Sequence, residues 1–505
     1  MSRREEITVQ SHGEKKAFLF PFSSPRSRFR AIELELKLIL LTGDLFFLFF
    51  SIFLGLEFRG FLQRLFPSLP PFVLKEHLSF FQQNIWLFLP VPLALLWQRL
   101  YRRLPFWEEL RRLWLALFEG FVLIYALVSL AKLGEQASRL TILFSLFISF
   151  FLFPFGRFLL KKWLFSFKRY RLPALVCPAG EEAAYLVRAL EREKTFGYEV
   201  LGFLDDRPAL YGRTFAGKKV FGPLRQAGKF ARLRGVDAIF LLQNGAPFPR
   251  LEELYAYLQR NVGEVFLVPS FTGLGLLNAE LAFFFARRLV FIRIINPLSS
   301  YFARFLKRFF DLVLASLLFI LALPIMGLIA LAIKLDSEGP IFFTHERVGR
   351  GGRTFRIYKF RTMHQNAEER LSLYLAQDPE KRRKWHIYRK LDDDPRVTRV
   401  GRILRRFSLD ELPQLVNVLK GDMSLVGPRP AMAEELKTYY AGKVHFYLAV
   451  RPGLTGLWQV SGRNRLSFEE RVRLDVWYVQ NWSLWLDLVI LLKTIPAVLR
   501  CEGSF

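Results

Sequence analysis

Cysteine is almost absent from this chain of 505 residues, which has only Cys177 and Cys501. Two cysteines so far apart in sequence exclude a disulfide framework and a cysteine-based metal site, and their scarcity fits a reducing compartment for the soluble parts. The marks of a cleavable signal peptide are also absent, because residues 1–35 are polar and basic and contain no short apolar run with a cleavage site. No helix-turn-helix, zinc-finger or aromatic-platform pattern appears, so nucleic acid is not an expected partner.

Positive charge and apolar side chains are both present in excess. The formal net charge is +28, apolar residues make up 52% of the chain, and phenylalanine alone occurs 54 times. The apolar content exceeds what soluble cores need, and long apolar runs near the N-terminus account for the excess. With membrane segments present, this charge predicts acidic lipid headgroups and phosphorylated substrates as partners.

Four apolar segments predict four transmembrane helices, because each has about the ~17–25 residues that a helix needs to cross the hydrocarbon. The second segment is the weakest, since Pro90 and Pro92 interrupt it. The segments lie at 38–56, 83–98, 113–131 and 140–156.

The distribution of basic residues predicts the orientation of these helices. Lysine and arginine gather in the N-terminal tail (1–35), in the 98–112 loop and after residue 157, whereas the intervening loops have fewer of them or offset them with glutamate. Positively charged flanks stay on the cytoplasmic side of the membrane. The tail, the second loop and everything after residue 157 should therefore be cytoplasmic, and the predicted four-helix bundle occupies 36–165.

Residues 170–295 predict a Rossmann-like α/β domain. Short apolar runs that read as buried strands alternate with helical stretches, and this βαβ pattern predicts a parallel sheet. The expected strands are 173–177, 198–206, 236–242 and 264–270, and the expected helices are 181–193 and 250–261.

The turn after the first of these strands resembles a dinucleotide-binding glycine loop around Gly180, with two differences. Pro178 and Ala183 stand where two of its three glycines would be. Asp205 and Asp206 end the next strand, near the place of a ribose-binding acid. Because proline is a poor residue for a tight turn that cradles a pyrophosphate, we favour a regulatory or structural domain without a cofactor.

Residues 296–505 form the third predicted unit, a monotopic α/β domain that opens with an apolar segment at 309–333. This segment is long enough to cross a bilayer, yet lysines and arginines flank both of its ends. Positive charge at both ends argues that both remain in the cytoplasm. Pro324 removes one backbone hydrogen bond and kinks the helix. The sequence therefore predicts a re-entrant helix that enters the membrane, bends and returns.

The stretch 405–414 contains two adjacent acids at an expected helix start. Ser408 and Glu411 have the spacing of a capping box, which predicts a helix that begins at Leu409. In the simplest interpretation, Asp410 and Glu411 are first-turn acids that complement the helix dipole.

Arginines near this helix start favour a catalytic interpretation. Arg405 and Arg406 precede it, and Arg429 follows between two prolines. A helix N-terminus flanked by arginines is an anion site, and a carboxylate there stays ionised beside a bound phosphate. This arrangement suits nucleophilic attack on phosphorus to give an acyl phosphate.

Two further basic stretches are candidates for phosphate binding. The run 355–363 alternates like a strand and places Lys359 and Arg361 on one face, although a solvated strand face would look the same. A glycine-containing loop bounded by Arg451 and Arg463 suits a phosphate or a nucleotide.

Two other stretches have a structural as well as a functional interpretation. The aspartates of 391–396 resemble a metal cluster, but Asp-Pro favours a turn, which we prefer. Aromatic residues near the C-terminus suit either the membrane interface or core packing; they are Trp477, Tyr478, Trp482 and Trp485.

Several motifs, in order, resemble those of the bacterial sugar transferases, the monotopic phosphoglycosyl transferases. The resemblance covers about residues 304–505, and the preceding parts resemble the large members of the family, with the undecaprenyl-phosphate galactose phosphotransferase group nearest. One position departs from the family pattern, because its Ser-Pro kink is Leu323-Pro324 here. The motifs are KRFFD, KFRTM, SLDELPQ, NVLKGDMSLVGPRP, RPGLTGLWQV and LDVWYV.

The resemblance implies a two-step enzyme. Asp410 of the Asp410–Glu411 dyad would attack the β-phosphorus of a UDP-hexose and release UMP, and undecaprenyl phosphate would then accept the hexose 1-phosphate. Lys359, Arg361, Arg405 and Arg429 would form a phosphate clamp. Mg²⁺ would bind at the dyad and the diphosphate.

The resemblance also implies a homodimer in the bacterial inner membrane that initiates surface polysaccharide synthesis. Galactose 1-phosphate is favoured over glucose 1-phosphate. A silent membrane scaffold with a nucleotide-sensing domain is the alternative, and it predicts a damaged dyad. A polytopic carrier or flippase predicts buried acids in the spanning helices, where we expect Asp44 to be the only one.

Overall fold

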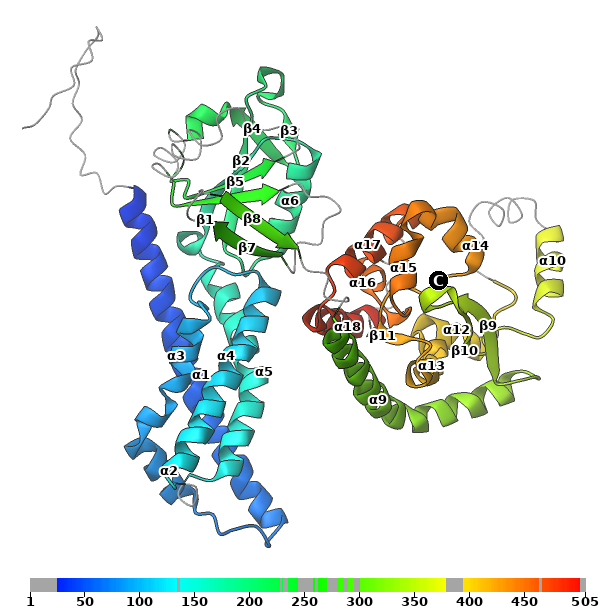
Figure 1. Cartoon of the computed structure of the whole chain (residues 1–505), viewed down its shortest axis with the longest axis horizontal. Coiled ribbons are helices and arrows are strands. Elements are labelled where there is room, and N and C mark those ends of the chain that lie inside the picture. Colours follow the sequence, from blue (N-terminus) through cyan, green and yellow to red (C-terminus); the bar gives the residue numbers. More distant parts are fainter. Residues whose placement is uncertain are drawn as a thin grey trace, which may run out of the picture. The chain divides into compact units, whose positions relative to one another are not determined.

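The computed structural model describes residues 25–133, 137–227, 229, 235–243, 258, 262–269, 279–284, 289–294, 300–377, 394–462 and 466–499. The chain divides into two compact units, Met1–Ser270 and Phe271–Phe505. Each unit has its own hydrophobic cores. Figure 1 colours the elements of both units in sequence order.

Three long helices form the membrane part of the first unit: α1 (Pro25–Leu65), α4 (Phe106–Leu130) and α5 (Arg139–Leu164). Each contains a stretch long and apolar enough to cross a membrane, so the protein is a membrane protein. α1 begins within the predicted basic tail and extends beyond the predicted span at 38–56. Hydropathy marks only the part of a helix that suits hydrocarbon, whereas the helix itself continues through charged residues on both sides.

The second predicted segment, 83–98, is not one helix. α2 (Leu74–Gln83) is followed by a 3₁₀ turn (Ile85–Phe88) and α3 (Pro90–Trp97), with a bend of 80° after α2. Pro90 stands in the first turn of α3, where its missing N–H costs nothing and its fixed φ suits a helix start. The prediction of a continuous helix here is therefore wrong.

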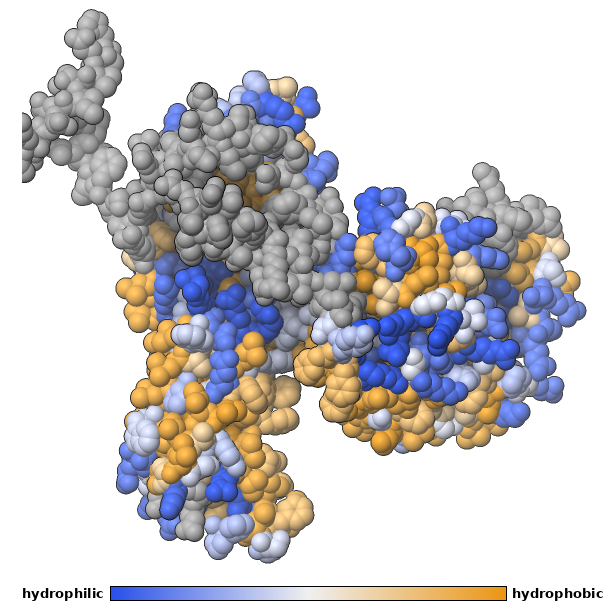
Figure 2. Space-filling view, viewed as in Figure 1, coloured by the Kyte–Doolittle hydropathy of each residue, from blue (hydrophilic) through white to orange (hydrophobic). Residues whose placement is uncertain are grey.

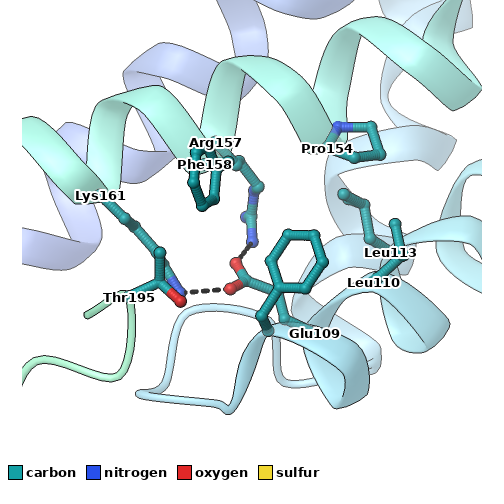
Figure 3. Close-up of a pocket in the computed structure, with 9 residues that line it drawn as sticks. Glu109, Leu110, Leu113, Pro154, Arg157, Phe158, Lys161 and Thr195 are labelled. Atoms are coloured by element: carbon teal, nitrogen blue, oxygen red, sulfur yellow. Dashed lines mark hydrogen bonds and ion pairs between the residues drawn. The ribbon is translucent and has the colours of Figure 1, made fainter. Parts of the chain in front are cut away.

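Charged side chains are buried inside the helix bundle. Arg157 on α5 donates to both carboxylate oxygens of Asp44 on α1 and, at 2.9 Å, to Glu109 on α4. Lys161, one turn later, donates to the other oxygen of Glu109 at 2.6 Å (Figure 3). Each of the four side chains is at most 7% exposed. The expectation that Asp44 is the only buried acid is wrong, because Glu109 lies just before the predicted span and meets two cations of α5.

A six-stranded sheet forms the α/β part of the first unit, in the order β3-β4-β2-β1-β5-β6. Neighbouring strands run parallel except for the β3–β4 pair. The four predicted strands and the first predicted helix are confirmed, and two strands were not foreseen. The elements are β1 (Leu172–Cys177), α6 (Glu181–Arg192), β2 (Tyr198–Leu204), β3 (Thr214–Phe215), β4 (Lys218–Gly222), β5 (Ala238–Gln243) and β6 (Glu264–Pro269).

The structure differs from the predicted α/β domain in two places within 250–295. The predicted helix at 250–261 lies outside the described residues, apart from Leu258. β7 (Ala279–Phe284) and β8 (Leu289–Ile294) form an antiparallel pair of their own and fall in the second unit.

The second unit contains one helix with an unusually exposed apolar surface, α9 (Tyr301–Asp336). It includes the predicted 309–333 segment and changes direction near its middle, where Pro324 lies inside the helix (Figure 1). Figure 2 shows apolar residues covering the surface of this unit along α9. Among the exposed side chains are Phe305, Phe309, Leu317, Leu321, Ile325 and Leu328. Such a helix is suited to contact lipid rather than water.

A hairpin and several short helices complete the second unit. β9 (Phe342–Val348) pairs antiparallel with β10 (Thr354–Phe360), and β11 (Ser424–Val426) pairs parallel with β12 (Gly453–Thr455). The main helices are α10 (Ala367–Gln377), α12 (Arg399–Arg406), α13 (Gln414–Lys420), α14 (Ala433–Glu435), α15 (Val444–Ala449), α16 (Leu457–Ser461), α17 (Phe468–Gln480) and α18 (Leu484–Leu499). Tyr478 and Trp482 are buried in the core with α9 and α13, so core packing is the right interpretation for these two aromatics.

The start of α9 is held to this core by a buried ion cluster. Lys307 lies 3.1 Å from Asp311 and 2.8 Å from Asp487 on α18, and it also donates to the carbonyl of Val426. Asp311 accepts a hydrogen bond from Ser424 at 2.8 Å. These charged groups can be buried because each has an oppositely charged partner or a hydrogen-bond partner. The cluster fixes the membrane helix against the strand that leads to Arg429.

Candidate active site

The two predicted acids lie on a short 3₁₀ turn, Leu409–Glu411, between α12 and α13. A helical turn begins at Leu409 as predicted, but the capping box is wrong. Ser408 is in the left-handed region, with φ of 55°, and its side chain makes no capping hydrogen bond. A capping residue needs an extended backbone, so Ser408 cannot act as the N-cap.

Lys359 on β10 lies between the two carboxylates. Its Nζ donates to Glu411 Oε1 at 2.6 Å and lies 3.7 Å from Asp410 Oδ2. The Asp410 side chain is 13% exposed and that of Glu411 34%. Lys359, which was predicted to lie on a strand face, therefore pairs with the two acids. It is 52 positions from Glu411 along the chain.

Burial sets the charge state of Asp410. Removal from water raises the pKa of this carboxyl, as does the neighbouring charge of Glu411, whereas Lys359 and Arg405 lower it. The net direction is upward. A partly desolvated carboxylate beside two cations is a stronger nucleophile than one in water, because it has less solvent to shed.

Arg405 is the second cation near Asp410. It is half-buried at the end of α12, and its Nε donates to the hydroxyl of Thr362 at 2.9 Å. Burial lowers its pKa, and Asp410 and Asp394 oppose that effect. Asp394 itself accepts three hydrogen bonds from the Arg396 side chain and one from its backbone, a local turn rather than a metal site. The turn interpretation is confirmed for Asp394, while Asp392 and Asp393 lie outside the described residues.

Two of the predicted phosphate ligands instead bond to main-chain carbonyls just beyond helix ends. Arg361 is 7% exposed and donates to the carbonyls of Ser337 and Glu338, which follow α9. Arg451 donates to the carbonyl of Gly421, which follows α13. Arginine satisfies orphan carbonyls at helix C-termini, so these two side chains have structural partners, and their contact with phosphate stays a prediction.

The remaining two predicted ligands are Arg429 and Arg463. The Arg429 guanidinium is exposed and lies 5.4 Å from the ring centre of Trp458 on α16. Arg463 is outside the described residues.

Asn417 on α13 positions Lys359, and sequence reasoning missed it. Its side chain is completely buried; it accepts from the backbone N–H of Tyr358 at 3.0 Å and donates to the carbonyl of Arg356 at 2.8 Å. These bonds fix β10 against the helix that follows the dyad. A buried asparagine at a polar position of an otherwise apolar helix face was the available signal.

The dinucleotide-like loop of the first unit binds its own chain. Asp205 accepts from the backbone N–H of Ala179 at 2.9 Å, and Arg207 donates to the Ala179 carbonyl. Asp206 accepts from the N–H of Leu224 at 2.8 Å. The carboxylate of Asp205 thus occupies a backbone donor that a pyrophosphate would use, and the role of this domain stays a prediction.

Known proteins resemble both parts of the chain. Residues 302–501 match the family described as bacterial sugar transferase, and residues 99–269 match one described as a CoA-binding domain. The undecaprenyl-phosphate galactose phosphotransferase of Salmonella typhimurium is 36% identical over 481 residues, covering 93% of this chain and 97% of that protein. The UDP-galactose-lipid carrier transferase of Erwinia amylovora is 38% identical, covering 81% of this chain and 85% of that protein.

Shorter likenesses cover one part of the chain each. The UDP-glucose:undecaprenyl-phosphate glucose-1-phosphate transferase of Caulobacter vibrioides is 46% identical, covering 39% of this chain and 72% of that protein. A solved structure of RSP, a Rex-family repressor, is 13% identical and covers 31% of this chain and 79% of that one, with a TM-score of 0.20 that carries no argument.

Proposed function

The chain belongs to the bacterial sugar transferase family, and we propose that it transfers hexose 1-phosphate from a UDP-hexose to undecaprenyl phosphate, the first step in building a surface polysaccharide. The observation that carries this proposal is the largely buried Asp410 carboxylate, which lies beside Lys359, Glu411 and Arg405. The same unit carries the lipid-facing helix α9. A soluble donor and a lipid acceptor can therefore reach one nucleophile in turn.

In the first step, a carboxylate oxygen of Asp410 attacks the β-phosphorus of the UDP-hexose. The bond from this phosphorus to the oxygen that bridges the two phosphates breaks, and UMP leaves with that oxygen. Lys359 and Arg405 offset the negative charge that gathers around phosphorus in the transition state. The product on the enzyme is an acyl phosphate that carries the hexose.

In the second step, a phosphate oxygen of undecaprenyl phosphate attacks the same phosphorus. The bond to Asp410 breaks and restores the carboxylate, and undecaprenyl-diphosphate-hexose leaves. An acyl phosphate and a sugar diphosphate are both reactive phosphoryl compounds, so neither step is steeply uphill.

Asp410 and Glu411 are suited to hold Mg²⁺. An oxygen of each carboxylate lies near the same Lys359 Nζ, at 3.7 and 2.6 Å, so the two acids lie close together and share one cation. Magnesium often binds to one or two carboxylates plus substrate phosphates, and the described residues assemble no group of three or more acidic, histidine or cysteine ligands. A bound Mg²⁺ would supply charge neutralisation at the diphosphate.

We expect UDP-galactose to be the preferred donor and UDP-glucose the next. The names of the Salmonella and Erwinia relatives favour galactose, and that of the Caulobacter relative favours glucose. Purified protein would be incubated with undecaprenyl phosphate and a panel of labelled UDP-sugars, and both UMP and lipid-linked sugar would be measured. A chain that produces neither with any UDP-sugar would contradict the proposed function.

We further propose that α9 is re-entrant, so that Tyr301 and Glu338 at its ends both face the cytoplasm. Both residues are exposed, and basic residues flank both ends. Single cysteines, Tyr301→Cys and Glu338→Cys, would be placed in a variant that lacks Cys177 and Cys501. We expect an impermeant thiol reagent to label both sites in inverted vesicles and neither in intact spheroplasts. Labelling of either site from the periplasmic side would exclude re-entry.

A silent scaffold with a nucleotide sensor is the weaker candidate. It requires a damaged dyad and an open nucleotide loop, whereas Asp410, Glu411 and Lys359 are in contact and Asp205 fills a loop donor. The proposed enzyme is a homodimer of the inner membrane with its catalytic unit on the cytoplasmic face, as the family resemblance implies.

A further inference from the structure

Three arginines and one tryptophan of the second unit lie near one another on four different segments. Arg347 is the last residue but one of β9, and Arg429 lies in the loop after β11. Trp458 lies on α16 and Arg471 on α17. Hydrogen bonds hold the first two segments together, because Val348 donates to the carbonyl of Ala431 at 3.0 Å.

The indole of Trp458 lies close to two of these arginines. The guanidinium carbon of Arg429 is 5.4 Å from the ring centre, and that of Arg471 is 5.1 Å from it. Contact with an aromatic ring stabilises a guanidinium but offers no hydrogen-bond acceptor in its plane. The in-plane N–H groups of these arginines therefore remain the groups that a ligand would meet.

Two buried donors in this group have no acceptor among the residues that the structure describes. They are the indole N–H of Trp458, which is 6% exposed, and the Nε–H of Arg471, which is 5% exposed. The nearest carboxylate to Arg471, that of Asp475, is 3.9 Å from Nε and accepts from the hydroxyl of Tyr440. Buried donors without acceptors are costly, and two of them beside one ring indicate a place for a ligand with acceptor oxygens.

The charges are also unbalanced. Burial lowers the pKa of Arg347, with repulsion from Arg429 and Arg471 adding to this effect and attraction to Glu435 opposing it. The two nearby acids are Glu435, which also accepts from a backbone N–H, and Asp475, whose pKa is raised by burial to about 6. Three guanidiniums thus face two carboxylates, and an anion would relieve their repulsion.

The β9–β10 hairpin connects this group to the dyad. Arg347 lies directly opposite Phe355 on β10, and Phe355 is four residues before Lys359. Cross-strand partners share a face, as do residues an even number apart, so Arg347 and Lys359 lie on the same face of the hairpin. Four residues of strand span about 13 Å, a separation that a nucleotide and the long arginine side chains can bridge.

We propose that Arg429 and Arg471, which contact Trp458, and the neighbouring Arg347 bind the phosphate monoester that reacts on the far side of the phosphorus from Asp410. This inference rests on the proposed function. In an in-line displacement the leaving and attacking oxygens lie on opposite sides of phosphorus. UMP therefore leaves on the side away from Asp410, and the lipid phosphate later attacks from that same side. One site with phosphate-binding chemistry serves UMP and undecaprenyl phosphate in turn.

Two substitutions test the site in the full-length protein. Arg347→Gln removes a half-exposed charge, and Trp458→Phe removes one N–H while keeping a ring. The matched control is Arg473→Gln, which removes an exposed arginine of the same helix as Arg471, paired with Glu469. UMP binding is measured by calorimetry, and the KM for UDP-hexose and for undecaprenyl phosphate are measured separately.

We expect Arg347→Gln to weaken UMP binding about tenfold or more and to raise the KM for undecaprenyl phosphate comparably, with a smaller loss for Trp458→Phe and none for Arg473→Gln. Thermal unfolding checks that each variant is folded. The inference would be overturned if Arg347→Gln and Trp458→Phe, both folded, bound UMP and undecaprenyl phosphate as well as Arg473→Gln does. It would also be overturned if the variants lost affinity for only one of these two ligands. Calorimetry with UMP needs no turnover, so its result stands even if the parent protein proves not to be a transferase.

Discussion

Asp410→Asn is expected to abolish release of UMP from a UDP-hexose, in the absence as well as in the presence of undecaprenyl phosphate. An amide has no negative charge with which to attack phosphorus, so the loss should reach roughly a thousandfold or more. The fold should persist, because asparagine matches aspartate in size and the Asp410 carboxylate lies 3.7 Å from Lys359 Nζ, beyond hydrogen-bond distance. UMP release without lipid is the decisive measurement, since it isolates the first step.

The matched control for this variant is Asp422→Asn, which changes an acid on the turn after α13 outside the proposed site. It should keep the parent rate, and both variants should unfold at or above the parent temperature at pH 7. For Asp410 the reason is thermodynamic, because its pKa is raised in the folded state. Such a group makes the folded protein less stable as the pH rises through that pKa, so replacing the ionised carboxylate at pH 7 does not destabilise the fold. UMP release near the parent rate by Asp410→Asn would exclude it as the nucleophile.

The pH dependence of UMP release should show an acid limb governed by Asp410. Only the ionised carboxylate attacks, and burial raises its pKa above the ordinary aspartate value of about 3.9. The rate should therefore fall as the pH decreases through a pKa above that value. The measurement is kcat/KM for the donor against pH, with unfolding monitored in parallel. An activity that persists unchanged down to pH 4 in folded protein would contradict the assignment.

Arg157→Met is expected to produce the largest loss of stability. Its guanidinium holds both oxygens of Asp44 and one oxygen of Glu109 inside the helix bundle. Removing it leaves Asp44 buried without its cation, and breaking a buried pair in this way costs about 3–5 kcal/mol. Unfolding of the purified protein in detergent measures the effect, together with the amount of protein recovered from membranes.

Lys162→Met is the matched control, because Lys162 is exposed on the same helix, next to the buried Lys161. It should change the free energy of unfolding by less than about 0.5 kcal/mol. The double variant Asp44→Asn, Arg157→Met should recover part of the loss, since it no longer buries an unpaired charge. If Arg157→Met proved as stable as Lys162→Met, water or another residue must compensate for the loss of Arg157.

Sequence periodicity and charge determined the larger divisions of this protein. Apolar length located three helices of the bundle and α9, and the alternation of strands and helices located the parallel sheet. These features depend on local properties, because a membrane span or a buried strand must be apolar along its own length. The dyad was also located from sequence, since its two acids are adjacent.

The partners of each arginine were decided only by the tertiary structure. Arg361, Arg405, Arg429 and Arg451 look alike in sequence, yet the first and last bond to carbonyls beyond helix ends, one lies by the dyad, and one lies by Trp458. Likewise Glu109 lies just before a predicted span in the sequence, and only the approach of α5 brings Arg157 and Lys161 to it. A guanidinium can donate hydrogen bonds to carbonyl, carboxylate and phosphate oxygens alike. Which of these it meets depends on the packing of segments that are far apart along the chain.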